Sequence, residues 1–493
     1  MSMNTLYMKH TVTYLTVLLC LVLGRPHAYA ETVTPQMRPN VLFIALDDLN
    51  DWIQLLDLGA PIKTPNIERL AERGVLFTKA YCASPACNPS RTAIMTGLRP
   101  TTSGVYGNKT DWRRALPDAV TLPQHFMEHG YRAEGAGKIF HHHYGGAFHD
   151  KGSFNDFLMM PDPPDAPMPE KKLNGLAKYG SRNTDWGLWP ADEAEAIDVR
   201  TANYVIKSLQ RKHDKPIFLA AGIFRPHMPF FAPQRFFDFY PPDNVAMPEI
   251  LEGDIDDLPS GAAKLLSSKK WFFRELMEIE AKSPGTWKEA VRAYQASATF
   301  ADAQVGRILD ALDNGDYARN TIIVLWSDHG YHLGEKEHWE KFALWEKTNH
   351  VPFIIVAPGI TRPGTRCERP VSLIDMYPTL IELCGLQPKP KLDGISLVPL
   401  LKNPNAKWTR PALMTYMWGN HAVRDQRWRY IQYADGTEEL YDHQKDSNEW
   451  YNVAGDPENT KVIDRLKQWL PVTEALPAPD MKKLKISTKG KNE

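Results

Sequence analysis

The run Asn40-Val-Leu-Phe-Ile-Ala-Leu46, followed directly by Asp47-Asp48, decides the fold of this chain. An uninterrupted apolar stretch of this length is typical of a strand buried on both faces of a parallel sheet. A second such stretch, residues 321–326, is followed by Ser327-Asp328-His329. Because open α/β sheets bind ligands beyond the carboxyl ends of their strands, the two polar endings predict an α/β fold with a site at that edge.

The polar endings of these two strands favour a cation site. Two adjacent carboxylates such as Asp47 and Asp48 repel each other unless a positive charge lies between them. A lone Asp-Asp pair usually has one side chain in solvent and the other capping a turn. Two core strands that end in Asp-Asp and in Asp-His are harder to explain in that way.

Composition and charge are those of an ordinary soluble globular protein. The chain has 493 residues, 43% hydrophobic and 24% charged, with a formal net charge of −1. This length is sufficient for one large domain and a smaller one. The near-neutral balance argues against nucleic-acid binding and against general attraction to a membrane, so anion binding has to be local.

The N-terminus has the pattern of an export signal. Lys9 and His10 precede an apolar run over 11–23, and Ala28-Tyr29-Ala30 is an A-x-A cleavage site. The apolar run is too short for a comfortable membrane span, and no later stretch is apolar enough for stable membrane insertion. We therefore predict a signal peptide over 1–30 and an exported protein, periplasmic or secreted (lysosomal in a eukaryote).

Cysteines are too few for a disulfide-built scaffold. Beyond the predicted signal they are Cys82, Cys87, Cys367 and Cys384. Cys367 and Cys384 could pair in an oxidising compartment, or Cys384 could simply be buried in its apolar helical run. The sequence leaves this pair open.

The segment Cys82–Gly97 places a cysteine at the start of a short predicted helix. Cys87 comes just before Pro89, and Gly97 ends the helix. The free N–H groups and the positive end of such a helix point toward Cys87, which suits a nucleophile that handles anions. The alternative is a small buried cysteine, and an isolated cysteine would favour that interpretation.

Three further segments carry candidate site residues. Gly137-Lys138-Ile-Phe-His141 follows a predicted strand, and Phe224-Arg225-Pro226-His227-Met228-Pro229-Phe230 follows another. The third segment contains Gly334, Trp339 and Lys341. The His227 side chain stands between two prolines and is therefore rigidly held, as a packed core histidine would also be.

These motifs, in this order, resemble those of the type I (formylglycine-dependent) sulfatases, and most closely the iduronate-2-sulfatase-like members. Cys87-Asn-Pro-Ser-Arg91 followed by Thr-Gly-Leu-Arg-Pro resembles the family's modification signature, and the resemblance covers nearly the whole mature chain. It implies an alkaline-phosphatase-like sandwich with a large mixed sheet between helices and a smaller C-terminal subdomain. It also implies that a formylglycine-generating enzyme oxidises Cys87 to formylglycine.

The resemblance further implies the site roles. Asp47, Asp48, Asp328 and His329, with the modified Cys87, would bind a divalent metal. Calcium is expected, although the His ligand leaves Mg²⁺ or Mn²⁺ possible. The formylglycine hydrate would attack sulfur beside Arg91, with Lys138 and Lys341 flanking the sulfate. His227 would protonate the leaving alcohol, and His141 would act as the base that restores the aldehyde.

The pattern of predicted secondary structure changes after about Lys402. Short strands are predicted over 413–418, 422–424, 428–433 and 438–441, with a helix over 460–470. We therefore predict a catalytic domain over 31–402, a C-terminal subdomain over 403–481 with an antiparallel sheet and a helix, and a flexible tail over 482–493.

The substrate class is the least determined prediction. Export and the iduronate-type motifs favour a sulfated polysaccharide such as ulvan, carrageenan or a glycosaminoglycan as substrate. The enzyme would remove a sulfate from a terminal sugar, at a uronate or similar 2-position. One alternative is a phosphatase or phosphodiesterase of the same superfamily, and another is a non-catalytic protein that binds sulfated glycans.

Overall fold

A mixed eight-stranded sheet organises the protein. The computed structural model describes residues 38–141, 148–161, 168–267 and 270–481. In spatial order the sheet consists of β13 (Thr365–Cys367), β2 (Val75–Phe77), β12 (Phe353–Val356), β9 (Thr321–Ser327), β1 (Asn40–Asp47), β7 (Ile217–Pro226), β4 (Arg132–Gly137) and β5 (Asp156–Leu158). The pairs β9–β1, β1–β7 and β7–β4 are parallel, whereas β12 runs antiparallel to both of its neighbours. The predicted α/β class is confirmed.

Strand β1 contributes side chains to two separate hydrophobic cores, which is why its sequence is apolar without interruption. Leu42, Ile44 and Leu46 belong to one buried cluster, whereas Val41 and Phe43 belong to the other. Successive side chains of a strand point to opposite faces, so a strand covered on both sides cannot alternate with polar residues.

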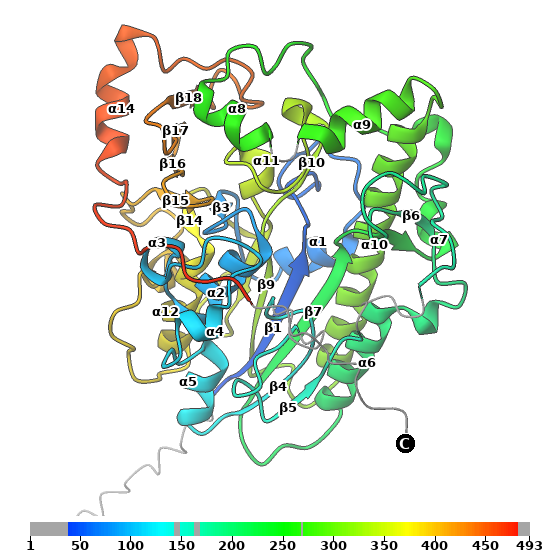
Figure 1. Ribbon diagram of the computed structural model, residues 1–493. Coiled ribbons are helices and arrows are strands. Elements are labelled where there is room, and N and C mark those ends of the chain that lie inside the picture. The colour runs from blue at the N-terminus through cyan, green and yellow to red at the C-terminus, as the bar shows by residue number, and fades with distance from the viewer. Residues whose placement is uncertain (1–37, 142–147, 162–167, 268–269, 482–493) are drawn as a thin grey trace, which may run out of the picture. The chain divides into compact units, whose positions relative to one another are not determined.

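Helices cover both faces of the sheet (Figure 1). One cluster is completed by α1 (Pro65–Ala71), α6 (Ile197–Leu209) and α10 (Thr286–Asp313). The other is completed by α2 (Cys87–Thr96), α5 (Leu122–Glu128), α12 (Met376–Leu383) and α13 (Val398–Lys402). Helix α10 alone spans 28 residues.

The C-terminal residues form a second, antiparallel sheet. It has the order β15 (Ala412–Thr415), β16 (His421–Arg424), β17 (Trp428–Gln432) and β18 (Glu438–Asp442), and α14 (Thr460–Lys467) packs against it. The predicted antiparallel sheet and helix are confirmed. The predicted boundary at 402/403 remains a prediction. The described residues from Arg38 onward form one compact unit.

Several expectations concern residues outside the described part of the chain. These are the signal peptide and the tail over 482–493. Among the described residues, no helix is long and apolar enough to cross a membrane. Cys82, Cys87, Cys367 and Cys384 are all buried free thiols in the structure.

Candidate active site

Four of the predicted site residues lie at the carboxyl ends of four neighbouring strands, at one edge of the large sheet. Lys138 follows β4, His227 follows β7, Asp47 ends β1, and Asp328 follows β9. In the sheet register Leu46 lies beside Ser327 and Asp47 beside Pro226. Parallel pairing therefore brings together side chains that are far apart in sequence, as the rule for open α/β sheets predicts.

Two glycines allow β4 and β7 to approach closely at this edge. Gly137 has φ +78°, and a Cβ there would lie 2.0 Å from the carbonyl oxygen of Gly222. A Cβ on Gly222 would in turn lie 2.4 Å from the backbone of Lys138. The close approach sets where the chain leaves β4, and thereby where Lys138 enters the site.

Cys87 is the first residue of α2, as predicted. The next N–H, that of Asn88, donates to Oδ1 of Asn108 at 3.0 Å, so a side chain from another segment caps the helix start. Gly97 ends the helix in the left-handed conformation with φ +72°. The whole of α2 is buried, which fixes Cys87 rigidly beneath the strand ends.

Cationic groups surround the Cys87 sulfur. Sγ lies 3.2 Å from Nζ of Lys341, 3.3 Å from Nε2 of His329 and 3.7 Å from Nζ of Lys138. Burial raises the pKa of the Cys87 thiol, but these three residues and a hydrogen bond with His141 outweigh burial and lower the pKa well below its usual value. The site is therefore built to stabilise negative charge at position 87.

Arg91 joins two of the carboxylates. Its Nε donates to Asp328 at 2.7 Å, its Nη2 lies 3.4 Å from Asp47, and its Nη1 donates to the carbonyl of Lys138. Burial and the neighbouring Asp47 raise the pKa of Asp328 to about 6, although Arg91 opposes this shift. Burial also raises the pKa of Asp47, but Lys138, His227 and Arg91 hold it below its usual range.

The carboxylates and His329 fit a divalent cation. Ligand atoms of Asp47, Cys87, Asp328 and His329 all lie within 4.8 Å of one another, as do those of Asp47, Asp48, Cys87 and His227. Both Asp47 oxygens are buried without a well-formed hydrogen bond in the described part of the chain, although they lie near Lys138 and Arg91. Nδ1 of His329 lies 3.1 Å from the carbonyl of Gly330, so Nδ1 carries a proton and Nε2 is the nitrogen that faces Cys87. Once Nε2 loses its own proton, it would be the ring atom that binds a metal.

The remaining predicted residues also reach this cluster. Lys341 Nζ donates to Oδ1 of Asp48 at 2.8 Å, and Asp48 and Cys87 raise the pKa of the Lys341 amine well above its usual value despite burial. His141 is buried, and its ring contacts Phe148 at 5.9 Å between centroids. Every predicted site residue thus lies in one continuous cluster.

Sequence reasoning missed several residues that support the site. Tyr294 on α10 donates to the carbonyl of Asp48 at 2.8 Å, and Ser90 donates to that of Asp328 at 2.6 Å. These contacts join segments that lie far apart in the sequence. Only Ser90 could have been identified from the sequence, because it lies within the cysteine motif. Four large aromatic side chains are buried in the core and do not line an open sugar site: Trp112, Trp186, Tyr331 and Trp339.

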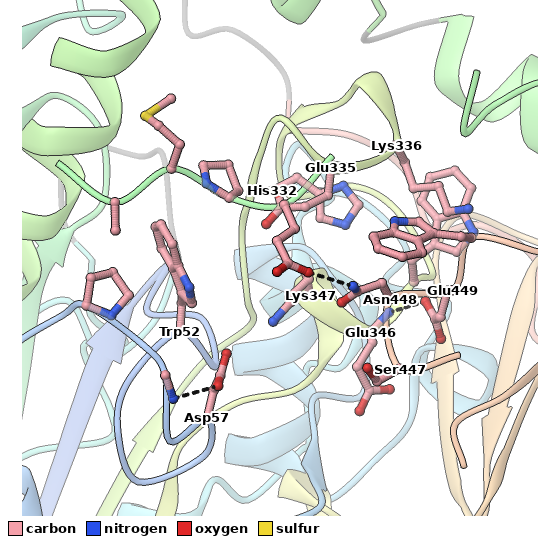
Figure 2. Close-up of a pocket in the computed structure, with 18 residues that line it drawn as sticks. Trp52, Asp57, His332, Glu335, Lys336, Glu346, Lys347, Ser447, Asn448 and Glu449 are labelled. Carbon is pink, nitrogen blue, oxygen red and sulfur yellow. Dashed lines mark hydrogen bonds between the residues drawn. The ribbon is translucent and has the colours of Figure 1, made fainter. Parts of the chain in front are cut away.

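A cavity of about 380 Å³ lies apart from Cys87, between the segment 332–347 and the turn 447–450 (Figure 2). It is next to the buried Glu346 and Glu449 and the half-buried His443, which lie close enough together to hold a metal ion. However, Arg429 forms ion pairs with both Glu346 and Glu449, the latter at 2.6 Å. This group is therefore already neutralised by an arginine and serves to join the C-terminal sheet to the segment after Lys341.

Comparisons with known proteins agree with this geometry. The sulfatase family matches residues 39–386, and the C-terminal region of N-sulphoglucosamine sulphohydrolase matches residues 334–475. A sulfatase from Formosa agariphila is 41% identical over 461 residues, covering 89% of this chain and 87% of the relative. Human iduronate 2-sulfatase is 30% identical over 414 residues, covering 76% of this chain and 73% of the relative. The solved structure of a 2-O GAG sulfatase has a TM-score of 0.66 at 23% identity, covering 87% of this chain and 90% of that one.

The fold and the strand-end site define a hydrolase with an alkaline-phosphatase-like α/β architecture. Since the sulfatase family matches most of the chain, and a 41% identical relative covers 89% of it, this chain belongs to the sulfatase family. It is an enzyme that hydrolyses sulfate esters. The resemblance and the fold predicted from sequence are confirmed.

Proposed function

We propose that this enzyme is an exported sulfatase that removes sulfate from a terminal sugar of a sulfated polysaccharide or its oligosaccharides. The observation that carries the proposal is the environment of Cys87, whose buried sulfur has Lys341, His329 and Lys138 within 3.7 Å. A site that stabilises an anion at this position also suits a sulfate group bound next to it.

Residue 87 acts as a formylglycine in this proposal. A formylglycine-generating enzyme would oxidise the Cys87 side chain, and the hydrated aldehyde would supply the hydroxyl nucleophile for sulfur. The place of Cys87 at the N-terminus of α2 favours negative charge on that hydroxyl. Arg91, held between Asp47 and Asp328, orients the surrounding carboxylates.

A divalent metal completes the site. Asp47, Asp48, Asp328 and His329 would hold it, with the modified residue 87 as a further ligand. Oxygen donors dominate this set, which suits calcium, magnesium and manganese alike. We propose calcium, with magnesium and manganese as the alternatives that the His329 ligand leaves open. When bound, the metal would supply positive charge next to the nucleophile and the sulfate oxygens.

The chain's own side chains handle the sulfate and the protons. Lys138 and Lys341 bind sulfate oxygens from two sides of residue 87. His227 donates a proton to the leaving alcohol, which a sugar hydroxyl needs because it is a poor leaving group. His141, hydrogen-bonded to residue 87, accepts the proton whose removal regenerates the aldehyde.

Two lines of support favour a glycan as the substrate. One 30% identical relative is human iduronate 2-sulfatase. The segments around Lys138 and His227 in this sequence resemble the iduronate-2-sulfatase type. The predicted export places the enzyme where extracellular glycans occur. We further propose that residues 150–161 and 168–190 and the C-terminal subdomain over 403–481 border the pocket, which favours chain ends. The iduronate-type motifs favour a uronate-like 2-sulfate.

A panel of defined sulfated oligosaccharides, with free sulfate measured by ion chromatography, tests the proposal. Release from non-reducing terminal residues of ulvan, carrageenan or glycosaminoglycan fragments is expected. Release only from aryl sulfates or choline sulfate would exclude the glycan assignment, and release from internal residues of intact polymer would exclude terminal action. Comparing aryl sulfate with aryl phosphate tests the phosphatase alternative, which requires the phosphate to react faster.

A further inference from the structure

The loop that carries His227 is anchored by a buried carboxylate on a neighbouring helix. Asp198 lies in the first turn of α6 and is fully buried. Its Oδ1 accepts the N–H of Phe224 at 2.6 Å, and its Oδ2 accepts the N–H of Arg225 at 3.0 Å. Hydrogen bonds to an ionised carboxylate are about twice as strong as neutral ones, so Asp198 fixes the backbone two residues before His227.

Arg225 continues this anchor along the loop. Its side chain is 2% exposed, and its Nε donates to the carbonyl of Phe231 at 2.9 Å. Nη1 donates to the carbonyl of His227 itself at 3.3 Å. The guanidinium packs near the rings of Phe224 and Phe231, at 5.2 and 5.8 Å from their centroids. Arg225 thus ties the end of the loop to its beginning, with His227 between them.

The ring of His227 has one orientation under these constraints. Nδ1 lies 2.6 Å from the carbonyl of Met228, which can only accept, so Nδ1 carries a proton. This leaves Nε2 as the ring nitrogen that can exchange a proton with the leaving-group oxygen. His227 also lies within 4.8 Å of ligand atoms of Asp47, Asp48 and Cys87, so its ring faces the reacting centre.

We propose that Asp198 and Arg225 are positioning residues for His227, and that they act on proton transfer to the leaving group rather than on sulfate binding. The inference rests on the proposed general-acid role of His227. A displacement of about 1 Å can cost roughly 10²-fold in rate, so loosening this anchor affects substrates that need the proton and spares those that do not.

The test measures kcat/KM for two substrates, a sulfated sugar and 4-nitrophenyl sulfate, whose phenolate leaves without protonation. In Asp198→Asn the amide group places a donor against one backbone N–H and breaks that hydrogen bond. We expect kcat/KM for the sugar sulfate to fall roughly 10- to 10²-fold, and kcat/KM for the aryl sulfate to fall less than about 3-fold. Arg225→Met should show the same split, with Arg225→Lys intermediate. The ratio between substrates is independent of how much of the preparation is folded or matured.

Asp302→Asn is the matched control. Asp302 is another buried carboxylate that accepts two backbone N–H groups, those of Asn66 at 3.1 Å and Ile67 at 2.8 Å, where α10 packs on α1. The Asp302→Asn substitution should lower the stability of the protein without changing the ratio of kcat/KM between the two substrates. Equal losses on both substrates in Asp198→Asn and Arg225→Met would overturn the inference.

A double-mutant cycle separates this inference from the proposed function. If Asp198 acts through His227, Asp198→Asn should cost nothing further on the sugar sulfate once His227→Ala is present. A multiplicative loss in the double variant would overturn the positioning role. Equal losses on both substrates in His227→Ala alone would instead overturn the general-acid assignment, and the inference with it.

Discussion

The Lys341 amine lies 3.2 Å from the Cys87 sulfur, although 254 residues separate the two in the chain. The backbone around Lys341 is held in an unusual conformation, because Glu340 and Phe342 both have positive φ, at +87° and +81°. Such conformations cost free energy in residues other than glycine, so the surrounding structure has to impose them. The N–H of Phe342 donates to the carbonyl of Pro85 at 3.0 Å, which ties this segment to the cysteine loop.

Lys341→Ala should lower kcat/KM for every sulfate ester by roughly 10²- to 10³-fold, as removal of one oxyanion contact does in other enzymes. Lys341→Arg should recover only part of this loss, because the planar guanidinium cannot occupy the place of a compact ammonium between Cys87 and Asp48. Steady-state kinetics on aryl and sugar sulfates measure both. Similar losses on the two substrates are expected, and a loss confined to the sugar would assign Lys341 to sugar recognition instead.

Cys87 should carry formylglycine in active protein made with the maturing enzyme. Peptide mass spectrometry of the tryptic fragment measures the modification. Cys87→Ala should abolish turnover while the thermal unfolding transition remains, because the substitution removes only a small side chain from a well-packed helix start. Fully active protein that contains only unmodified cysteine would contradict this prediction.

His227→Ala should distinguish substrates by their leaving groups. We expect a loss on the order of 10²–10⁴ with a sulfated sugar and a smaller loss with 4-nitrophenyl sulfate. A series of aryl sulfates should show a steeper dependence of rate on phenol acidity in the variant. Equal losses across the series would move the proton donor elsewhere, with His141 the next candidate.

The strands that deliver the site could be predicted from the sequence because their signals are local. Asn40–Leu46 and Thr321–Trp326 are apolar runs with polar endings, and the structure extends each by one residue, to Asp47 and Ser327. The C-terminal strands were also predicted within a few residues, since polar turns separate them. The site residues themselves came from family motifs, and parallel pairing explains why those motifs meet.

Contacts between distant segments could not be predicted in this way. The pairing of Arg429 with Glu346 joins residues 83 apart, and neither residue has a local pattern that indicates its partner. Asp198 likewise lies in an ordinary amphipathic helix, where an acidic residue in the first turn usually stabilises the helix dipole. Helices α8 (Ser260–Ser267) and α9 (Lys270–Glu280) were not predicted either, since long-range packing sets their place.

Metal removal should lower both activity and stability. Chelation and dialysis should reduce sulfatase activity, and calcium should restore it. A ligand at 100 times its Kd stabilises the folded state by about 2.7 kcal/mol, so calcium should raise the thermal unfolding temperature measurably. Asp328→Asn should abolish this rise, whereas Asp302→Asn should retain it. Magnesium and manganese at matched concentrations test the metal's identity, and no rise with any of the three would contradict the metal site.

The C-terminal sheet should stabilise the segment that carries Lys341 through Arg429. This fully buried guanidinium donates to the carbonyl of Leu344 at 2.9 Å and pairs with Glu449 at 2.6 Å and with Glu346. Arg429→Met should leave both carboxylates without this partner and cost about 3–5 kcal/mol in the free energy of unfolding.

Arg465→Met is the matched control for Arg429→Met, because Arg465 pairs with Asp425 at 2.7 Å while half its side chain is exposed to solvent. Breaking an exposed pair should cost less than about 1 kcal/mol. Chemical denaturation at neutral pH measures both variants. Because Leu344 lies three residues after Lys341, Arg429→Met should also raise KM for sulfate esters, whereas Arg465→Met should not. Similar costs in the two variants would show that the buried cluster does not stabilise this region.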